Sequence, residues 1–349
     1  MAGGPPVRIV LVGGGVQPIP PTGYGAVERI IAELAVALRA TGAEVTILNR
    51  VRQRRTRDEI PFALELPRLL KGERYDVLHA HTPVVANRLA EHGRPLVYTS
   101  HSRHWYYRTQ LSHRWGYWLE RRAVRRARAF IALTDPLAET VAKAVRPPLP
   151  PIHVIPFGVD ATAYAPAWER RTGRQVLGVG VVAPFKRWHL AARAIHGTGA
   201  TLTIVGPIVD SDYAESVRRE GPHVRLVGEV PEEELRRLFA ESDLLLHPSQ
   251  VEILSATVLE ALAAGLPVIG GSGVRGVVDP GVTGWDVPDA AVEPFVAGMH
   301  DHIRKLLGDD GRRREMGNAA RALARERYDW TSIAARHLEV YRSIGGAPA

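Results

Sequence analysis

Two glutamates separated by seven residues, Glu252 and Glu260, are the residues whose types and spacing most directly indicate chemistry. Glu252 follows an apolar run that ends at His247, and Glu260 lies in a helical pattern that begins shortly afterwards. In a strand-loop-helix segment both carboxylates can face one cleft, and the unpaired amides at the helix start can meet an anion there. The segment closes with Gly265-Leu-Pro267-Val, which is typical of a turn into the next strand.

A glycine-rich segment near the N-terminus is a second candidate site for an anion. An apolar run over 7–12 leads into three glycines at 13–15, and Gly23 and Gly25 precede a helical pattern. Backbone amides of a glycine turn at a helix N-terminus favour negative charge. The spacing is not that of the G-x-G-x-x-G fingerprint, so phosphate contact and a plain loop both stay open as interpretations.

The composition indicates a compact protein of about two domains. The chain has 349 residues, of which 45% are hydrophobic, and none of its apolar runs reaches the length of a membrane-spanning helix. The absence of cysteine excludes disulfides, thiolate metal sites and cysteine nucleophiles. Because an apolar run follows the first residues without a charged and apolar leader, we expect a cytoplasmic location.

Short β-branched runs alternate with helical patterns along the chain, which predicts βα units and parallel sheets. Strands are expected at 7–12, 44–48, 76–79, 96–99, 130–133, 152–155, 176–180, 201–205, 223–227, 244–247 and 267–269. Helices are expected at 26–40, 136–145, 211–219, 231–240 and 256–264, with a helical tail over 292–344. Prolines and weak periodicity place the linker at 156–172.

Two Rossmann-like halves in series are the simplest architecture for this pattern. The first domain is expected to comprise residues 1–157, with a C-terminal helix at about 330–349 returning to it, and the second domain residues 158–329. Open parallel sheets bind ligands beyond the carboxyl ends of their strands. The functional site is therefore expected in the cleft between the two domains.

Together these motifs resemble the retaining glycosyltransferases of family 4. The hallmark is Glu252-x7-Glu260 followed by Ala-Leu-Ala-x-Gly-Leu-Pro-Val. Further matches follow the family order: Ile155-Pro-Phe-Gly158-Val-Asp160 between the domains, Pro184-Phe-Lys186-Arg187 after the first strand of the second domain, Tyr98-Thr-Ser-His101, and Gly281-Val-Thr-Gly284-Trp-Asp-Val-Pro288. The resemblance implies the α/β GT-B fold, in which two doubly wound Rossmann-like domains face each other across a cleft.

For the second domain, the resemblance implies the binding of a nucleotide-sugar donor. Lys186 would hold the diphosphate, where its ammonium offsets the charge of the leaving group, and Arg187 is a further candidate contact. Glu252 would lie beside the transferred sugar, and Glu260 would accept hydrogen bonds from the ribose hydroxyls. The amides that meet the sugar or the phosphate would be those of Ile253, Leu254 and Ser255.

For the first domain, the resemblance implies contacts with the same sugar. His101 would contact it, and the backbone at Gly23 and Gly25 would approach it closely. A core-facing histidine is the alternative role for His101, and a solvated capping glutamate is the alternative for Glu260.

The chain departs from the family pattern at two places. Val181 stands five residues before Lys186, where the family usually has arginine, and Arg187 or Arg275 are the residues that could replace it. The loop after Glu252 reads Ile-Leu-Ser instead of Gly-Phe-Gly. These departures are the basis of an alternative hypothesis, a catalytically silent GT-B protein that binds a sugar nucleotide as a partner subunit.

No metal site and no cofactor are expected. Asp210-Ser-Asp212 has the spacing of a metal motif, but its place before a helix favours capping. His79 and His81 can lie on one face of a strand, and hydrogen bonding at the strand end is the favoured role.

Positive charge is concentrated in the first half of the chain. Residues 1–165 carry 23 basic and 13 acidic residues, and residues 166–349 carry 22 and 24. The dense stretch 103–128 holds Trp105, Tyr106, Tyr107, Trp115, Tyr117 and Trp118. On a helix, one side would present Arg114, Trp115, Trp118, Arg121, Arg122, Arg125, Arg126 and Arg128. We expect this side, together with Trp105, to form a surface that suits an anionic membrane or a phosphorylated acceptor. A plain solvated face is the alternative, and nucleic acid is not expected.

The sequence therefore predicts a retaining, metal-independent glycosyltransferase. It would move a hexosyl group from a UDP- or GDP-sugar to a lipid-linked or cell-envelope glycan acceptor held by the basic first domain, with a peripheral position at the inner face of the membrane. The alternatives are the silent binding protein and a transferase that acts on a soluble metabolite.

Overall fold

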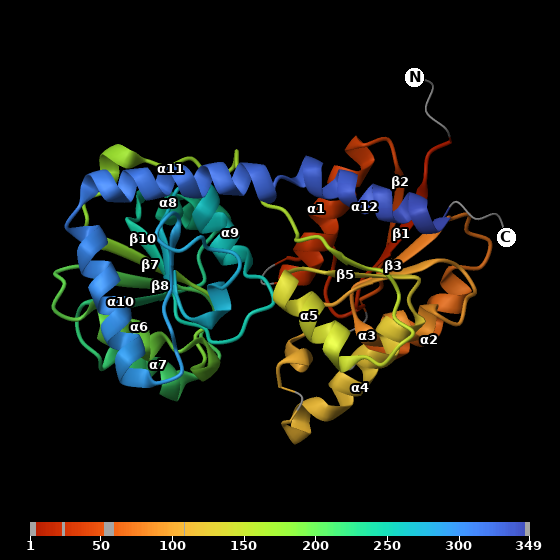
Figure 1. The fold of residues 1–349 in the computed structure, drawn as a ribbon, viewed down its shortest axis with the longest axis horizontal. Coiled ribbons are helices and arrows are strands. Elements are labelled where there is room, and N and C mark those ends of the chain that lie inside the picture. Colours follow the sequence, from red (N-terminus) through yellow and green to blue (C-terminus); the bar gives the residue numbers. More distant parts are fainter. Residues whose placement is uncertain (1–4, 23–24, 52–58, 108, 346–349) are drawn as a thin grey trace. The chain divides into compact units, whose positions relative to one another are not determined.

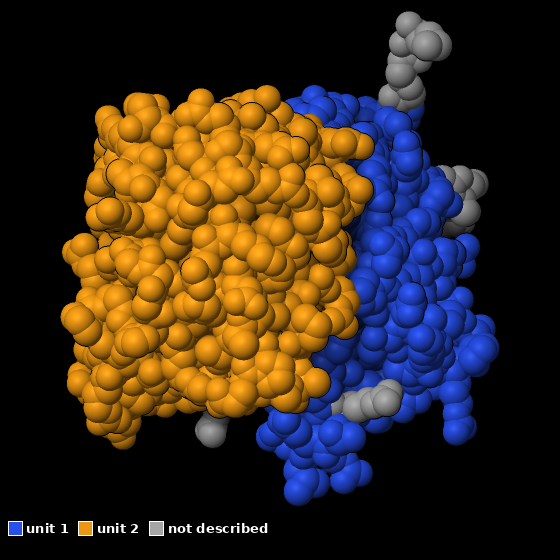
Figure 2. All heavy atoms as spheres, turned by 60° about the vertical axis from the view of Figure 1, so that its left-hand side comes forward, with its two compact units in different colours: residues 1–158, 330–349 blue, residues 159–329 orange. Residues whose placement is uncertain are grey.

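The computed structural model describes residues 5–22, 25–51, 59–107 and 109–345, and the chain divides into two compact units. Unit 1 comprises Met1–Gly158 and Trp330–Ala349, and unit 2 comprises Val159–Asp329 (Figure 2). The chain thus leaves unit 1 once and returns to it with its last helix. Each unit is built on its own parallel β-sheet (Figure 1).

The sheet of unit 1 has six parallel strands in the order β2-β1-β3-β4-β5-β6. The strands are β1 (Arg8–Val12), β2 (Glu44–Leu48), β3 (Val77–Ala80), β4 (Leu96–Thr99), β5 (Ala129–Ala132) and β6 (Ile152–Val154). Every residue of β3, β4 and β5 is buried, as expected for central parallel strands with helices on both faces. The strand order reverses between β1 and β3, which is where such sheets place ligands.

The helices of unit 1 cover both faces of this sheet. They are α1 (Ala26–Ala40), α2 (Glu59–Leu69), α3 (Pro83–Leu89), α4 (Leu111–Arg126), α5 (Asp135–Ala144) and α12 (Trp330–Gly345), with a short 3-10 helix η2 (Arg103–Trp105). Helices α1 and α12 lie side by side (Figure 1) and share one core with the sheet, to which α1 contributes Leu34 and α12 contributes Tyr341.

The sheet of unit 2 also has six parallel strands, in the order β12-β11-β10-β7-β8-β9. The strands are β7 (Gln175–Val179), β8 (Thr201–Val205), β9 (Val224–Gly228), β10 (Leu244–His247), β11 (Val268–Gly270) and β12 (Gly284–Asp286). In chain order this is the Rossmann arrangement, and the order reverses between β7 and β10.

The helices of unit 2 pack around that sheet. They are α6 (Trp188–Ile195), α7 (Ser211–Arg218), α8 (Glu232–Glu241), α9 (Ala256–Ala263), α10 (Val292–Leu307) and α11 (Asp310–Arg327), with the 3-10 helices η3 (Trp168–Arg170), η4 (Pro184–Lys186) and η5 (Ser272–Val274). Trp188 and Phe295 are fully buried members of the core that α6 and α10 form with the sheet.

The predicted parallel βα pattern is confirmed, and the structure adds elements that the pattern did not indicate. These are helices α2, α3 and α6 and strand β12. The boundary between the units, at Gly158 and Val159, lies within the predicted linker at 156–172, and Val159, Tyr164 and Arg171 are buried in unit 2. The Tyr164 ring packs edge-on against Phe239, with 5.5 Å between the ring centroids.

Candidate active site

Lys186 and Glu252 meet beyond the carboxyl ends of the two strands between which the sheet of unit 2 reverses its order. Lys186 ends η4, which follows β7, and Glu252 lies in the loop that follows β10. The Lys186 Nζ atom lies 2.6 Å from Glu252 Oε1. Both side chains are mostly buried, with 12% and 15% of their surface exposed. The fold therefore joins a cation and a carboxylate that are 66 residues apart in the sequence.

His247 is a third member of this group. It is the last residue of β10 and is fully buried, and its Nε2 atom lies 3.5 Å from Glu252 Oε1. Burial lowers the pKa of His247, so the ring is neutral at neutral pH. Burial alone would raise the pKa of Glu252, but the interactions with His247 and with the Lys186 charge outweigh it and hold that pKa well below its usual range. Glu252 is therefore an ionised carboxylate.

Helix α9 begins four residues after Glu252. The intervening Ile253, Leu254 and Ser255 are buried, and Ser255 is the N-cap residue of the helix. Because the first amides of a helix have no partner within it, this segment can receive an anion or a sugar hydroxyl next to the Lys186–Glu252 pair. Glu260 lies in the second turn of α9 and is partly exposed.

The turn at η5 packs tightly against the Glu252 loop. A Cβ atom at Gly273 would lie 2.7 Å from the Ser249 carbonyl oxygen and 3.2 Å from Glu252 Cγ, so only glycine fits there without a shift. Asp289 holds the same turn from outside, because its carboxylate accepts hydrogen bonds from the Ser272 hydroxyl at 2.6 Å and the Ser272 amide at 3.2 Å.

The side chain of Arg187 follows Lys186 and makes contacts within unit 2. Its backbone is left-handed, with φ 58°, and its guanidinium lies 4.5 Å from the centroid of the buried Phe295 ring. The guanidinium donates to the Pro248 carbonyl at 2.9 Å and lies 3.4 Å from the Asp289 carboxylate. The role of Arg187 as a donor contact stays a prediction.

The two positions tied to the missing family arginine have local roles. The Val181 carbonyl accepts a hydrogen bond from the Trp188 indole at 3.0 Å. Arg275 is exposed and donates to Asp286 at 3.2 Å. Lys186 thus remains the cation that this structure places beside Glu252.

In unit 1, the glycine segment after β1 forms a close-packed turn. Gly15 has φ 74° and donates its amide to the Asn49 side chain at 2.9 Å. Gly25 is the N-cap residue of α1, and a Cβ atom there would lie 2.8 Å from Pro21 Cβ. The other predicted glycine, Gly23, lies outside the described residues.

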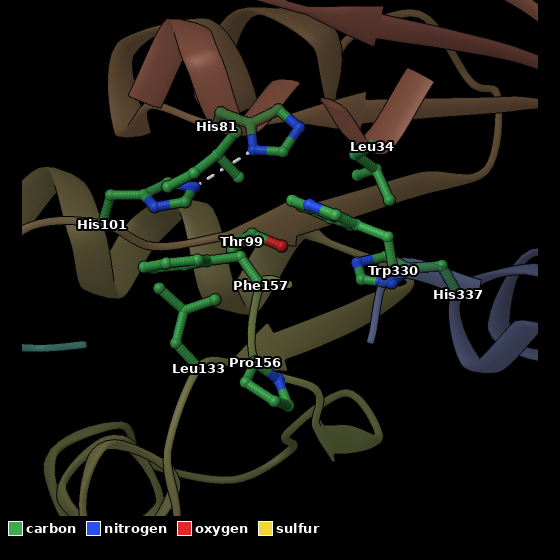
Figure 3. A pocket seen from close by; sticks show the side chains of 10 residues that line it. Leu34, His81, Thr99, His101, Leu133, Pro156, Phe157, Trp330 and His337 are labelled. Carbon is green, nitrogen blue, oxygen red and sulfur yellow. Dashed lines mark hydrogen bonds between the residues drawn. The ribbon is translucent and has the colours of Figure 1, made fainter. Parts of the chain in front are cut away.

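A histidine cluster occupies the carboxyl ends of β3 and β4. His81 Nδ1 lies 3.1 Å from His101 Nε2, and Figure 3 shows these two rings meeting above Thr99. Deeper in the unit, His79 bonds the Thr99 hydroxyl at 2.8 Å and the Tyr341 hydroxyl of α12 at 2.7 Å. The cluster therefore joins the sheet to the returning helix.

The rings of this cluster are uncharged at neutral pH. Burial lowers the pKa of His101 to about 4 and also that of His337 to about 4. His81 and His101, with Trp330 and His337, line a cavity of about 10 Å³, which is room for about one water molecule. His101 is itself partly exposed, so a ligand can still contact it. The hydrogen bonds of the buried histidines lie behind it.

Helix α4 exposes most of the predicted arginine and tryptophan side. Trp115 and Trp118 are 69% and 45% exposed, and Arg122 and Arg125 are exposed as well, whereas Arg121 is half-buried. Trp105 does not belong to this surface, which corrects the prediction. It lies in η2, is 2% exposed and donates its indole N–H to the Ser100 hydroxyl at 3.0 Å.

Three further observations concern expectations raised by the sequence. Asp210 is the N-cap residue of α7 and accepts the Tyr213 amide at 2.9 Å, so it caps a helix as expected. Within the described ranges, acidic residues and histidines do not form a group of three or more that could hold a metal ion. In the same part of the chain, no helix is both long and apolar enough to cross a bilayer.

The fold of the two units is that of a known class of two-domain α/β proteins. Among solved structures, sucrose-phosphate synthase from Thermosynechococcus elongatus matches with a TM-score of 0.82 and 20% identity, covering 98% of this chain and 100% of that one. Anabaena HepE in complex with UDP and glucose matches with a TM-score of 0.76 and 18% identity, over 97% and 100%. These likenesses confirm the predicted α/β GT-B fold.

Sequence comparison gives the family. Residues 25–163 match the family model described as Glycosyltransferase Family 4, and residues 166–323 match the model described as Glycosyl transferases group 1. The alpha-maltose-1-phosphate synthase of Mycolicibacterium smegmatis is 29% identical over 330 residues, which cover 81% of this chain and 83% of that protein. The chain belongs to glycosyltransferase family 4, and the predicted family is confirmed.

Sequence reasoning missed several residues that support the site. His247, Gly273 and Asp289 were not singled out, although each contacts the Glu252 loop or its neighbouring turn. Only His247 carried a signal, because it directly precedes the Pro-Ser-Gln-Val-Glu252 segment.

Proposed function

We propose that this glycosyltransferase is a retaining enzyme that moves a hexosyl group from a UDP- or GDP-sugar to an acceptor without a metal ion. The Lys186–Glu252 pair at the switch point of unit 2, beside the N-terminus of α9, is the observation that carries this proposal. A cation and free helix amides in one mostly buried place suit a diphosphate, and the adjacent carboxylate suits sugar hydroxyls.

Lys186 has the role of charge neutralisation in this proposal. As the bond from the sugar to the phosphate breaks, negative charge grows on the leaving diphosphate, and an ammonium group placed there lowers the barrier. Because Lys186 contacts Glu252 at 2.6 Å, a bound diphosphate would share or replace that contact. Lys186 thus takes the place that a metal ion has in other phosphate sites.

Glu252 acts as an ionised group. Because His247 and Lys186 hold its pKa below the usual range, we assign Glu252 to accepting hydroxyl hydrogen bonds and to stabilising positive charge on the sugar ring. In the proposed step, the acceptor oxygen attacks the anomeric carbon on the face that the phosphate leaves. One carbon–oxygen bond forms, one breaks, and the acceptor proton passes to the leaving phosphate.

For the acceptor, we propose a lipid-linked or cell-envelope glycan held by unit 1, because the exposed arginines and tryptophans of α4 suit such a substrate. A soluble sugar phosphate is the second candidate, supported by the similarity to the alpha-maltose-1-phosphate synthase of Mycolicibacterium smegmatis. Val181 in place of the family arginine supports a third candidate, a silent protein that binds a sugar nucleotide.

A transfer assay tests this proposal. Purified protein is incubated with UDP-glucose or GDP-mannose in excess EDTA, with membrane extract or a hexose phosphate as acceptor, and the anomeric configuration of the product is read by NMR. We expect transfer with retention that Lys186→Ala loses and Lys305→Ala, an exposed lysine on α10, keeps. An inverted product would contradict the retaining mechanism, and nucleotide binding without transfer would favour the silent protein.

A further inference from the structure

One face of α4 combines exposed indoles with exposed guanidinium groups, and we name it the Arg/Trp face. It consists of Arg114, Trp115, Trp118, Arg121, Arg122 and Arg125. The two indoles stack on each other, with 5.0 Å between ring centroids and 23° between ring planes. Leu111, at the start of the helix, is 81% exposed and extends the apolar part. Such a concentration of exposed large apolar side chains is unusual for a surface that faces only water.

The positive charges of this face have few acidic partners. The single acidic residue of α4 is Glu120, which is buried and therefore on the opposite side. Among the described residues, one arginine of α4 forms an ion pair: Arg126 lies 3.6 Å from Glu91. The Arg122 guanidinium instead lies 5.4 Å from the centroid of the Trp118 ring. The face thus presents cations with their indoles and lacks the neighbouring carboxylates of an ordinary solvated helix.

The back of α4 fixes this face in place. Ala123 and Val124 are fully buried, and the Asn87 amide of α3 donates to the Leu119 carbonyl at 2.9 Å. An open hollow of about 440 Å³ is lined by Trp118, Arg121, Arg122, Arg125 and Arg126. A hollow with four guanidinium groups is a place for phosphate oxygens, since arginine binds them in a fork geometry.

We propose that the Arg/Trp face docks unit 1 on an anionic lipid bilayer, with lipid phosphates in the arginine hollow and the indoles at the headgroup level. A soluble polyanion would use the arginines alone, whereas tryptophan beside arginine matches the boundary between charged headgroups and acyl chains. Each arginine near an anionic surface strengthens binding about fivefold. This inference concerns attachment and does not depend on the proposed transfer reaction.

Vesicle sedimentation tests the proposal without donor or acceptor. The full chain is mixed with phosphatidylcholine vesicles, or with vesicles that also contain about 30% phosphatidylglycerol. We expect binding to the anionic vesicles alone, and its loss as NaCl rises from about 0.05 M to about 0.5 M, because salt screens the attraction.

Matched variants separate the two contributions. The double variant Arg122→Ala/Arg125→Ala should weaken binding about 30-fold, and Trp115→Ala/Trp118→Ala should weaken it about tenfold or more. The controls are Arg174→Ala/Arg225→Ala, two exposed arginines of unit 2, and Val36→Ala/Leu64→Ala, each 66% exposed in unit 1. Both controls should bind as the unaltered protein does, and thermal unfolding checks that all variants fold.

Three results would overturn the proposal. The first is equal sedimentation with both kinds of vesicle, and the second is full binding by the arginine double variant. The third is binding to heparin with no binding to vesicles, which would identify a soluble polyanion as the occupant. Because no sugar donor is present in the assay, none of these results bears on the transfer reaction.

Discussion

Replacing Glu120 with glutamine removes a buried carboxyl group from the underside of α4 and should change how the stability of unit 1 depends on pH. Glu120 is fully buried, and its Oε2 atom accepts the Tyr98 hydroxyl of β4 at 2.7 Å. Burial raises the pKa of Glu120 to about 7, and the Tyr98 hydrogen bond offsets only part of that rise. The carboxyl group is therefore protonated in the folded protein under conditions where the unfolded chain has lost the proton.

The sign and size of the effect follow from that difference. Below pH 4.5 both states hold the proton, and the stability from the neutral carboxyl is fully present. As the pH rises to about 7, the unfolded state loses its proton first, so the free energy of unfolding falls. A pKa shift of roughly 2.5 pH units corresponds to about 3 kcal/mol. Glutamine does not ionise, so Glu120→Gln should lack this loss.

Urea unfolding at a series of pH values measures the difference. Relative to the unaltered protein, Glu120→Gln should gain about 3 kcal/mol between pH 4.5 and pH 8. Glu139→Gln, at a glutamate of α5 that is 69% exposed, is the control and should change this difference by less than about 0.5 kcal/mol. Parallel stability curves for Glu120→Gln and the unaltered protein would refute the reasoning, because Glu120 would then titrate as an exposed residue does.

Three further predictions concern unit 2. Lys186→Ala should lower turnover by about 100-fold or more while Lys305→Ala changes it less than twofold, and steady-state rates with any active donor would show it. Arg171→Ala removes a buried guanidinium that donates to the carbonyls of Ala240, Ala264 and Gly265, so urea unfolding should show a loss of about 3 kcal/mol, and a loss below about 1 kcal/mol would contradict this role. Gly273→Ala forces the Glu252 loop to move, so donor affinity should fall about tenfold with the circular dichroism spectrum unchanged.

Much of the fold could be predicted because parallel strands buried on both faces are continuous apolar runs. Residues 244–247 and 96–99 are examples, since every side chain of β10 and β4 is buried. Three of the missed elements are short, because β12 has three residues, α3 seven and α6 eight, and such lengths give few repeats for a periodic pattern. Helix α2 has eleven residues but contains Pro67, a residue type that argues against a helix interior.

The candidate site could be predicted only where local sequence sets the geometry. Glu252 was recognisable from its spacing to Glu260, but its contacts with Lys186 and His247 depend on the order of β7 and β10 in the sheet. Trp105 was placed on the surface because the helical pattern was extended through 103–128, whereas α4 begins at Leu111. The contacts of Arg187 with Phe295 and Asp289 join residues about a hundred positions apart, so they depend on the tertiary fold and not on local sequence.

Calorimetric titration with UDP, GDP and ADP is the most direct test of the central claim that unit 2 binds a nucleotide-sugar donor at the Lys186–Glu252 pair. We expect either UDP or GDP to bind. Lys186→Ala should weaken that binding at least about tenfold, and Lys305→Ala should leave it unchanged. Binding of none of the three nucleotides, or equal binding by Lys186→Ala, would contradict the assignment of the donor site.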